Sequence, residues 1–81
     1  MGKRRLKFHD LRRILRHFGV VEERSRGKGD HILFTRSLPE GKFSYPIPDR
    51  TDVKPCYVKG VRRRLMLLPE DGVSDEEFYR H

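Results

Sequence analysis

The first regular pattern along the chain is that of an amphipathic helix. Apolar residues recur at intervals of three and four positions, which is the spacing of one helix face, at Leu11, Ile14, Leu15 and Phe18. Gly19 follows directly, and glycine often ends a helix because it tolerates a left-handed backbone conformation. Three arginines lie off the apolar stripe and are predicted to face solvent or a ligand: Arg12, Arg13 and Arg16.

After Gly19 the pattern changes to that of β-strands. A strand predicted over residues 20–26 leads into Gly27-Lys28-Gly29, which is a turn signal, and residues 31–36 then have β-branched and aromatic content. A second turn at residues 39–41 precedes a strand of period two, in which Phe43, Tyr45 and Ile47 alternate with Ser44 and Pro46. Pro46 has no amide hydrogen for a sheet ladder, so this strand should lie at an edge or end early.

A loop over residues 48–55 leads to a second helix, predicted over residues 56–68 and ended by Pro69. Its apolar stripe comprises Val58, Val61, Leu65 and Leu68, and three cations are predicted to lie largely outside it: Lys59, Arg62 and Arg63. Ser74 and Glu77 have the spacing of a capping box, which predicts a short last helix carrying Phe78.

The predicted order is α-β-β-β-α with a short C-terminal helix, an α+β fold. Strands joined by short turns pair antiparallel, so helices should cover one face of a three-stranded sheet and leave the other open for a ligand. Strand alternation places His31, Leu33 and Thr35 on one face and Ile32 and Phe34 on the other. If the Ile32 and Phe34 pair packs on the helices, His31 lies on the open face.

At 81 residues the chain has room for one domain, over residues 1–81, and for no large cofactor. One cysteine, Cys56, can neither form an internal disulfide nor build a metal site, which favours a cytoplasmic protein. The histidines lack the paired spacing of a zinc site, so no metal is expected. No apolar run is long enough to cross a membrane, and no signal peptide is visible.

Charge is the bulk property that bears most on function. The net charge is +7, but residues 1–69, which begin with a basic arm at residues 1–7, carry 18 basic and seven acidic side chains, a balance of +11. The acidic C-terminal segment, residues 70–81, has five acids and one base, a balance of −4. A basic body attracts polyanions, so we expect a nucleic-acid partner. The opposite charges also suggest the hypothesis that the acidic segment folds back on the body.

The second predicted helix is the most basic segment. Residues 54–64 contain five bases and no acid. Such a helix can lie along phosphates or on an anionic membrane. The interspersed Val and Leu side chains are better explained as core than as a lipid-facing surface, so contact with RNA is favoured over contact with a membrane.

His31 is the candidate catalytic residue. RNA cleavage without a metal needs a base for the 2′-hydroxyl, an acid for the leaving 5′-oxygen and cations for the phosphate, and histidine can serve as acid or base near neutral pH. The glycine-rich string before His31 can present backbone amides, although by itself it is equally an ordinary hairpin turn. The candidate RNA-binding residues are Lys28, Gly29, Arg12, Arg16, Lys59, Arg62 and Arg63.

Nearly the whole chain resembles the HicA-type toxins. The resemblance rests on the element order, on Phe18-Gly19-Val20, on Gly29-Asp30-His31-Ile32-Leu33-Phe34 and on Gly72-Val73-Ser74-Asp75-Glu76-Glu77-Phe78. It implies a double-stranded-RNA-binding-domain-like fold, a metal-independent mRNA endoribonuclease with His31 as the catalytic histidine, and a HicB-like antitoxin as partner. The sequence departs from the family where Asp30 replaces a common Ser and where Arg50 stands at a frequent His. These departures bear on activity more than on fold.

Two other functions fit the same residues. A non-catalytic RNA-binding module on this fold would bind RNA with a steep salt dependence and leave it intact. A protein-interaction domain would use its basic face for an acidic partner and would bind no RNA.

Overall fold

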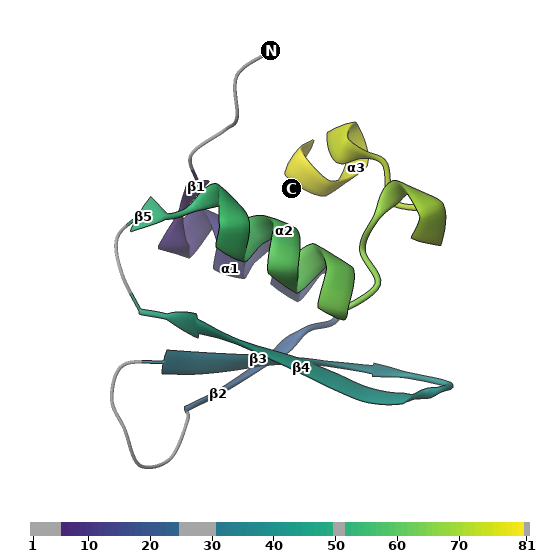
Figure 1. Ribbon diagram of the computed structural model, residues 1–81, viewed down its shortest axis with the longest axis horizontal. Helices are drawn as coiled ribbons and strands as arrows, with labels where there is room; N and C mark the ends of the chain where they lie inside the picture. The colour runs from purple at the N-terminus through teal and green to yellow at the C-terminus, as the bar shows by residue number, and fades with distance from the viewer. Residues whose placement is uncertain (1–5, 25–30, 50–51, 81) are drawn as a thin grey trace.

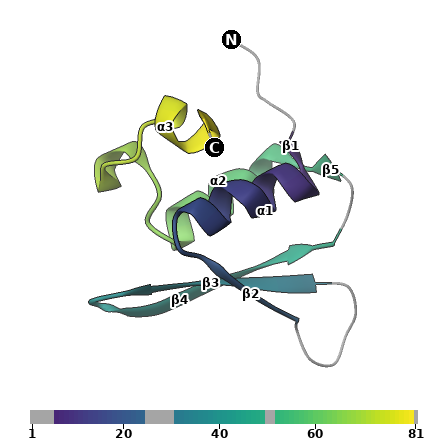
Figure 2. The ribbon, with the colours of Figure 1, turned by 180° about the vertical axis from the view of Figure 1, so that it is seen from behind.

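In the computed structural model, which describes residues 6–24, 31–49 and 52–80, a three-stranded antiparallel sheet carries its helices on one face (Figure 1). The spatial order of the strands is β2 (Val21–Arg24), β3 (His31–Leu38) and β4 (Gly41–Pro48). Two helices, α1 (Phe8–His17) and α2 (Pro55–Arg64), lie over one face of this sheet. The view from behind shows that no described helix covers the other face (Figure 2). The predicted α+β class and three-stranded antiparallel sheet are confirmed.

The two faces of the sheet are assigned as the strand alternation predicts. Ile32 and Phe34 are buried beneath the helices, and Phe34 packs its ring against Phe8 of α1 with 6.0 Å between centroids. His31 and Leu33 therefore belong to the uncovered face. The strand order also places β4 at an edge of the sheet, which is the position that its prolines require.

The first helix forms and ends as its sequence predicts. Leu11, Ile14 and Leu15 are buried, so the apolar stripe faces the core. At the C-terminal end, Gly19 adopts a φ of 81° and its amide donates to the carbonyl of Arg16 at 3.0 Å. The next amide donates back to Leu15, also at 3.0 Å. This pair of bonds satisfies carbonyls of the last turn and reverses the chain into the sheet.

The second helix ends four residues before the predicted Leu68. Met66 adopts a φ of 60°, and the amide of Leu67 donates back to the carbonyl of Arg62 at 2.7 Å, so the chain reverses before Pro69 is reached. As a result Leu67 is fully buried, and Leu68 is not part of the core. The prediction failed because Met, unlike Gly, gives no sequence signal for a left-handed residue.

A side chain from the sheet stabilises this helix end. The guanidinium of Arg36 donates to the carbonyl of Leu65 at 2.8 Å and to that of Met66 at 3.1 Å. Both carbonyls lie beyond the last regular turn of α2, where intrahelical partners run out. Arg36 thus ties the C-terminal end of α2 to the middle strand of the sheet.

A second, very short sheet joins the two segments that lead into α1 and α2. Strand β1 (Leu6–Lys7) pairs antiparallel with β5 (Asp52–Val53). Leu6 and Val53 are buried, so the last part of the predicted basic arm and of the predicted loop contribute to the core. The last two residues of the predicted basic arm thus form a strand, and residues 1–5 lie outside the described residues.

The C-terminal segment packs against the body. It contains a single 3-10 turn, η1 (Pro69–Asp71), and a short helix, α3 (Asp75–Arg80), with the predicted capping bond from the Glu77 amide to Ser74 Oγ at 3.0 Å. Phe78 is fully buried and stacks on Phe18 with 6.0 Å between centroids. The hypothesis that this segment folds back is confirmed, but much of the contact is apolar rather than electrostatic.

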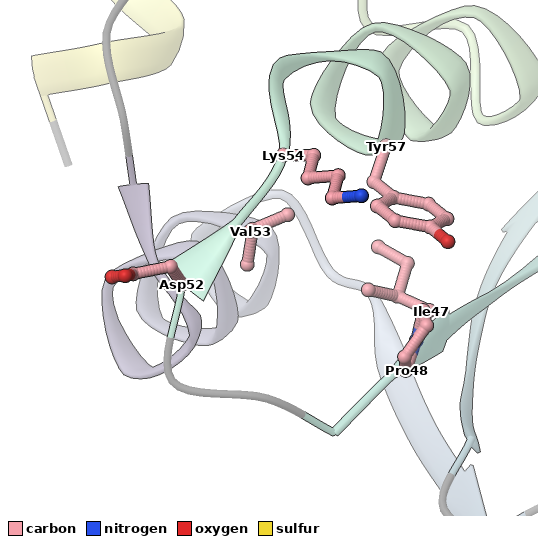
Figure 3. A pocket seen from close by; sticks show the side chains of 6 residues that line it. All are labelled: Ile47, Pro48, Asp52, Val53, Lys54 and Tyr57. Carbon is pink, nitrogen blue, oxygen red and sulfur yellow. The ribbon is translucent and has the colours of Figure 1, made fainter.

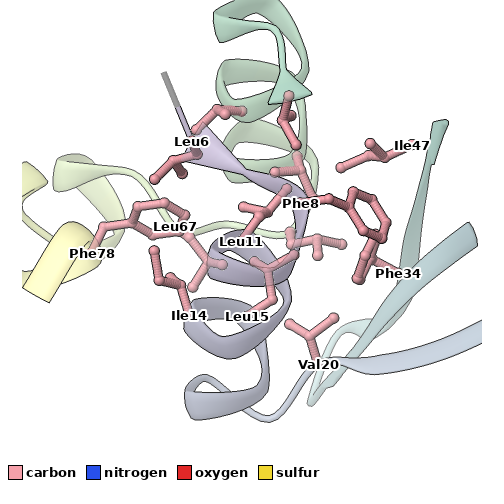
Figure 4. Close-up of a cluster of buried hydrophobic side chains, with 14 of the residues drawn as sticks. Leu6, Phe8, Leu11, Ile14, Leu15, Val20, Phe34, Ile47, Leu67 and Phe78 are labelled. Atoms are coloured by element: carbon pink, nitrogen blue, oxygen red, sulfur yellow. The ribbon is translucent and has the colours of Figure 1, made fainter. Parts of the chain in front are cut away.

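One hydrophobic core unites these elements (Figure 4). Figure 4 shows Phe78 and Leu67 meeting Ile14 on one side of α1, while Phe34 and Ile47 approach from the sheet. Among the residues that the structure describes, every helix is too short or too polar to traverse a lipid bilayer.

Candidate nucleic-acid interface

Four exposed cations lie along α2. Lys54 precedes the helix, Lys59 and Arg63 lie one helical turn apart, and Arg64 follows. Within residues 6–24, 31–49 and 52–80, none of these four side chains forms an ion pair with a carboxylate. Arg64 Nε donates instead to the carbonyl of Ser44 at 3.4 Å. We refer to Lys54, Lys59, Arg63 and Arg64 as the α2 cation row.

The arginines of α1 are arranged differently, because each has a carboxylate nearby. Arg12 Nη2 donates to Glu22 Oε1 at 2.7 Å and its Nε donates at 3.0 Å, a bond that raises the pKa of Arg12. Arg16 lies 3.9 Å from the same carboxylate. Arg13 pairs with Asp10 at 3.2 Å. The charge of these arginines is therefore partly neutralised within the protein.

The two sets of cations lie on opposite flanks of the molecule. Arg12 and Arg16 meet Glu22 on β2, whereas Arg64 meets Ser44 on β4, and these strands are the two edges of the sheet. Figures 1 and 2, seen from opposite sides, accordingly show α2 nearer the viewer in one and α1 in the other. The candidate RNA-binding residues of the two helices are not brought together on one surface.

Arg62 has a structural position, which corrects the prediction that it lies outside the apolar stripe and contacts RNA. Its side chain is buried, and its guanidinium donates to Leu67 O at 2.9 Å, to Val73 O at 3.1 Å and to Asp75 Oδ1 at 2.8 Å. It also lies 4.5 Å from the centroid of Phe78. These partners occupy the guanidinium and attach the C-terminal segment to α2, so Arg62 is not part of the α2 cation row.

His31 is exposed at the first position of β3, on the sheet face that no helix covers. Its partner across the ladder is Pro48 of β4, which supplies neither a proton nor a charge. The other candidates around it, Lys28 and Gly29, lie outside the described residues, as do Asp30 and Arg50. The structure therefore confirms the predicted face for His31 without placing its predicted neighbours.

The rest of the uncovered face carries few charges. Thr35 and Ser44 share a hydrogen bond of 2.8 Å between their hydroxyl groups, and Val21 of β2 is 59% exposed. The register places Leu33 beside Pro46 on the same face. A phosphate backbone would find little attraction here, so the α2 cation row is the better candidate for polyanion binding.

A pocket that the sequence did not reveal lies between the first turn of α2 and the end of β4 (Figure 3). It encloses about 160 Å³ and is lined by Ile47, Pro48, Asp52, Val53, Lys54 and Tyr57. Tyr57 directly precedes Val58, the first residue of the predicted apolar stripe, and had no predicted role. No sequence pattern connects it with β4, which is more than seven positions away in the chain.

Within the described residues, no three His, Cys, Asp or Glu side chains come together in a group that could hold a metal ion. Comparison with known proteins gives no significant match, whether to a family model, to a curated protein or to a solved structure.

Proposed function

We propose that this protein is a HicA-type toxin endoribonuclease that binds mRNA through the α2 cation row and cleaves it, without a metal, using His31. The observation that carries the proposal is the contrast between the helices: α1 arginines have carboxylate partners, and the α2 row has none among the described residues. Unpaired surface cations release counterions when they bind phosphates, which is the main source of affinity for RNA.

His31 supplies the chemistry in this proposal. Its imidazole is exposed on the uncovered sheet face, so an RNA strand can reach it without displacing a helix. As a base it would accept the 2′-hydroxyl proton, and the 2′-oxygen would attack the adjacent phosphorus and displace the 5′-oxygen, which takes a proton from water. The products are a 2′,3′-cyclic phosphate and a 5′-hydroxyl. The cation row would hold the flanking phosphates while this exchange takes place.

The fold type, the place of action and the partner protein are part of the same proposal. The α-β-β-β-α order, with both long helices on one face of the sheet, supports a double-stranded-RNA-binding-domain-like architecture. We further propose that the protein acts in the cytoplasm and is neutralised there by a HicB-like antitoxin. An acidic partner surface over the α2 cation row would suffice to block RNA binding.

The test is incubation of a mixed-sequence RNA with the protein in EDTA, beside the His31→Ala variant. A matched control is His9→Ala, which removes another exposed histidine, on α1. We expect cleavage by the wild type and by the control and none by His31→Ala, with all three folded by circular dichroism. Cleavage by His31→Ala would remove this residue from the mechanism.

A second candidate is a non-catalytic RNA-binding module on the same fold. It is favoured by two observations: the residue paired with His31 is Pro48, and the α2 cation row lies on the flank of the sheet rather than on the face that His31 occupies. Intact RNA in all three incubations, together with salt-sensitive binding, would select this alternative.

A further inference from the structure

We propose that the pocket between α2 and β4 binds one unstacked nucleobase of single-stranded RNA, with Lys54 on the adjoining phosphate. The inference rests on RNA binding by the α2 cation row and adds to it the strandedness of the substrate. Bases in a duplex are stacked and paired and cannot enter a side pocket, whereas those of a single strand can be splayed out and stacked on aromatic rings.

The walls of the pocket suit a flat, apolar ligand. Figure 3 shows the ring of Tyr57 over Ile47, with Val53 and Pro48 on the remaining sides. Ile47 and Val53 are almost completely buried, so they form the floor of the pocket and are held in place by the core, while Tyr57 and Pro48 are only partly buried. Tyr57 is half-buried and leaves part of its ring accessible, which allows a base to stack.

The charge at the rim favours the phosphate of a nucleotide. Lys54 is exposed, and in Figure 3 its ammonium group extends towards Tyr57. Asp52 also borders the pocket, but its carboxylate points away and lies 3.9 Å from Lys7 Nζ. Asp52 therefore does not pair with Lys54, whose ammonium group is left at the rim of the pocket to meet a phosphate.

The pocket lies next to the cation row but on the other face of the sheet from His31. Lys54 borders the pocket at the N-terminal end of α2, and Lys59 and Arg63 lie further along the same helix. Ile47 places the pocket on the face that α2 covers, whereas His31 belongs to the uncovered face. Pro48 lines the pocket, is the ladder partner of His31 and lies at the end of the edge strand β4, so an RNA strand that reaches both would pass around this edge of the sheet.

Binding of small ligands to the wild type tests the pocket without any substitution. Adenosine 5′-monophosphate and ribose 5-phosphate carry the same phosphate, but only the first carries a base. Binding is followed by the methyl and aromatic NMR signals of the protein. We expect the nucleotide to shift the signals of Ile47, Val53 and Tyr57, and ribose 5-phosphate to leave them unchanged. Equal effects of the two ligands on the pocket signals, or none, would overturn the proposal.

A second experiment uses two single-stranded oligonucleotides of equal length and charge, one with normal bases and one with abasic positions. Both carry 2′-O-methyl groups, which prevent cleavage through the 2′-hydroxyl. We expect the wild type to prefer the base-containing strand by about 5- to 160-fold, which corresponds to the affinity contributed by one base–aromatic stack. Tyr57→Leu keeps an apolar side chain over Ile47 and should abolish the preference while binding the abasic strand normally.

The outcomes separate this inference from the proposed function. Equal affinity of the wild type for the two strands, with salt-sensitive binding, would overturn the pocket and leave RNA binding by the cation row in place. Binding of neither strand would overturn both. Lys54→Ala, compared with Lys42→Ala on the exposed turn side of β4, should weaken nucleotide binding only in the first variant.

Discussion

The ring of Tyr45 on β4 lies directly against the backbone of Gly60, in the middle of α2. A Cβ atom at Gly60 would come within 2.6 Å of Tyr45 Cζ, which is closer than such atoms approach in proteins. Glycine inside a helix ordinarily lowers its stability by about 1 kcal/mol relative to alanine. Here it permits the close approach of α2 and the edge strand that also frames the pocket.

Gly60→Ala should therefore destabilise the protein, although alanine is the better helix former. Overpacking of this kind lowers the free energy of unfolding by about 1–3 kcal/mol, which urea denaturation would measure. In a Tyr45→Ala background the aromatic ring is absent, and Gly60→Ala should instead stabilise the helix by up to about 1 kcal/mol. A stabilising effect in both backgrounds would show that the ring moves aside freely.

The elements with strong periodicity were predictable from the sequence. Leu11, Ile14 and Leu15 define α1 because three residues at helical spacing agree, and the alternation around Ile32 and Phe34 orients β3. In each case the information is local: the pattern and its physical cause lie within one element. The same reasoning assigned His31 to the uncovered face before its surroundings were known.

The features that were missed depend on contacts between distant segments. Arg62 is buried because carbonyls and a carboxylate 5, 11 and 13 residues further along the chain receive its hydrogen bonds. The neutralisation of Arg12 by Glu22 and the pocket beside Tyr57 likewise need the tertiary fold. Arg62 lies four positions after Val58, at the border of the apolar stripe, and Arg63 follows it, but the sequence does not show that the Arg62 guanidinium has buried acceptors.

The different surroundings of Arg62 and Arg63 give a matched pair of substitutions. Arg62→Met keeps much of the apolar volume but leaves the carbonyls of Leu67 and Val73 without their donor, and we expect a loss of about 2–3 kcal/mol in the free energy of unfolding. Arg63→Met, one position along on the surface, should change it by no more than about 0.5 kcal/mol. Comparable losses in the two variants would contradict the anchoring role of Arg62.

The acidic C-terminal segment offers a prediction about stability. Deleting residues 70–81 would remove the fully buried Phe78, so the shortened chain should lose its cooperative unfolding transition rather than simply bind RNA more tightly. Phe78→Ala alone should lower the free energy of unfolding by about 3–5 kcal/mol, measured by urea denaturation. An unchanged transition after the deletion would mean that the core is complete without this segment.

The effect of the acidic charges on RNA binding can be tested with substitutions that leave the core intact. Glu70 and Glu76 are exposed and lie outside the core, so Glu70→Gln with Glu76→Gln raises the net charge by two and leaves Phe78 in place. Long-range repulsion predicts a modest gain in RNA affinity at low salt that disappears above about 0.15 M, where the screening length is roughly 8 Å. A gain that persists at high salt would instead indicate direct contact with RNA.

The decisive comparison for the interface removes two charges from either helix. Lys59→Ala with Arg63→Ala takes them from the α2 cation row, whereas Arg13→Ala with Arg16→Ala takes them from the paired set on α1. If each cation of the row holds one phosphate of a single strand, the first variant should reduce the slope of log affinity against log salt by about 1.4. The second has the same net charge, so it controls for the long-range field and should retain most of the slope. Fluorescence anisotropy across a salt series would measure both, and equal losses would show that RNA responds to total charge rather than to this row.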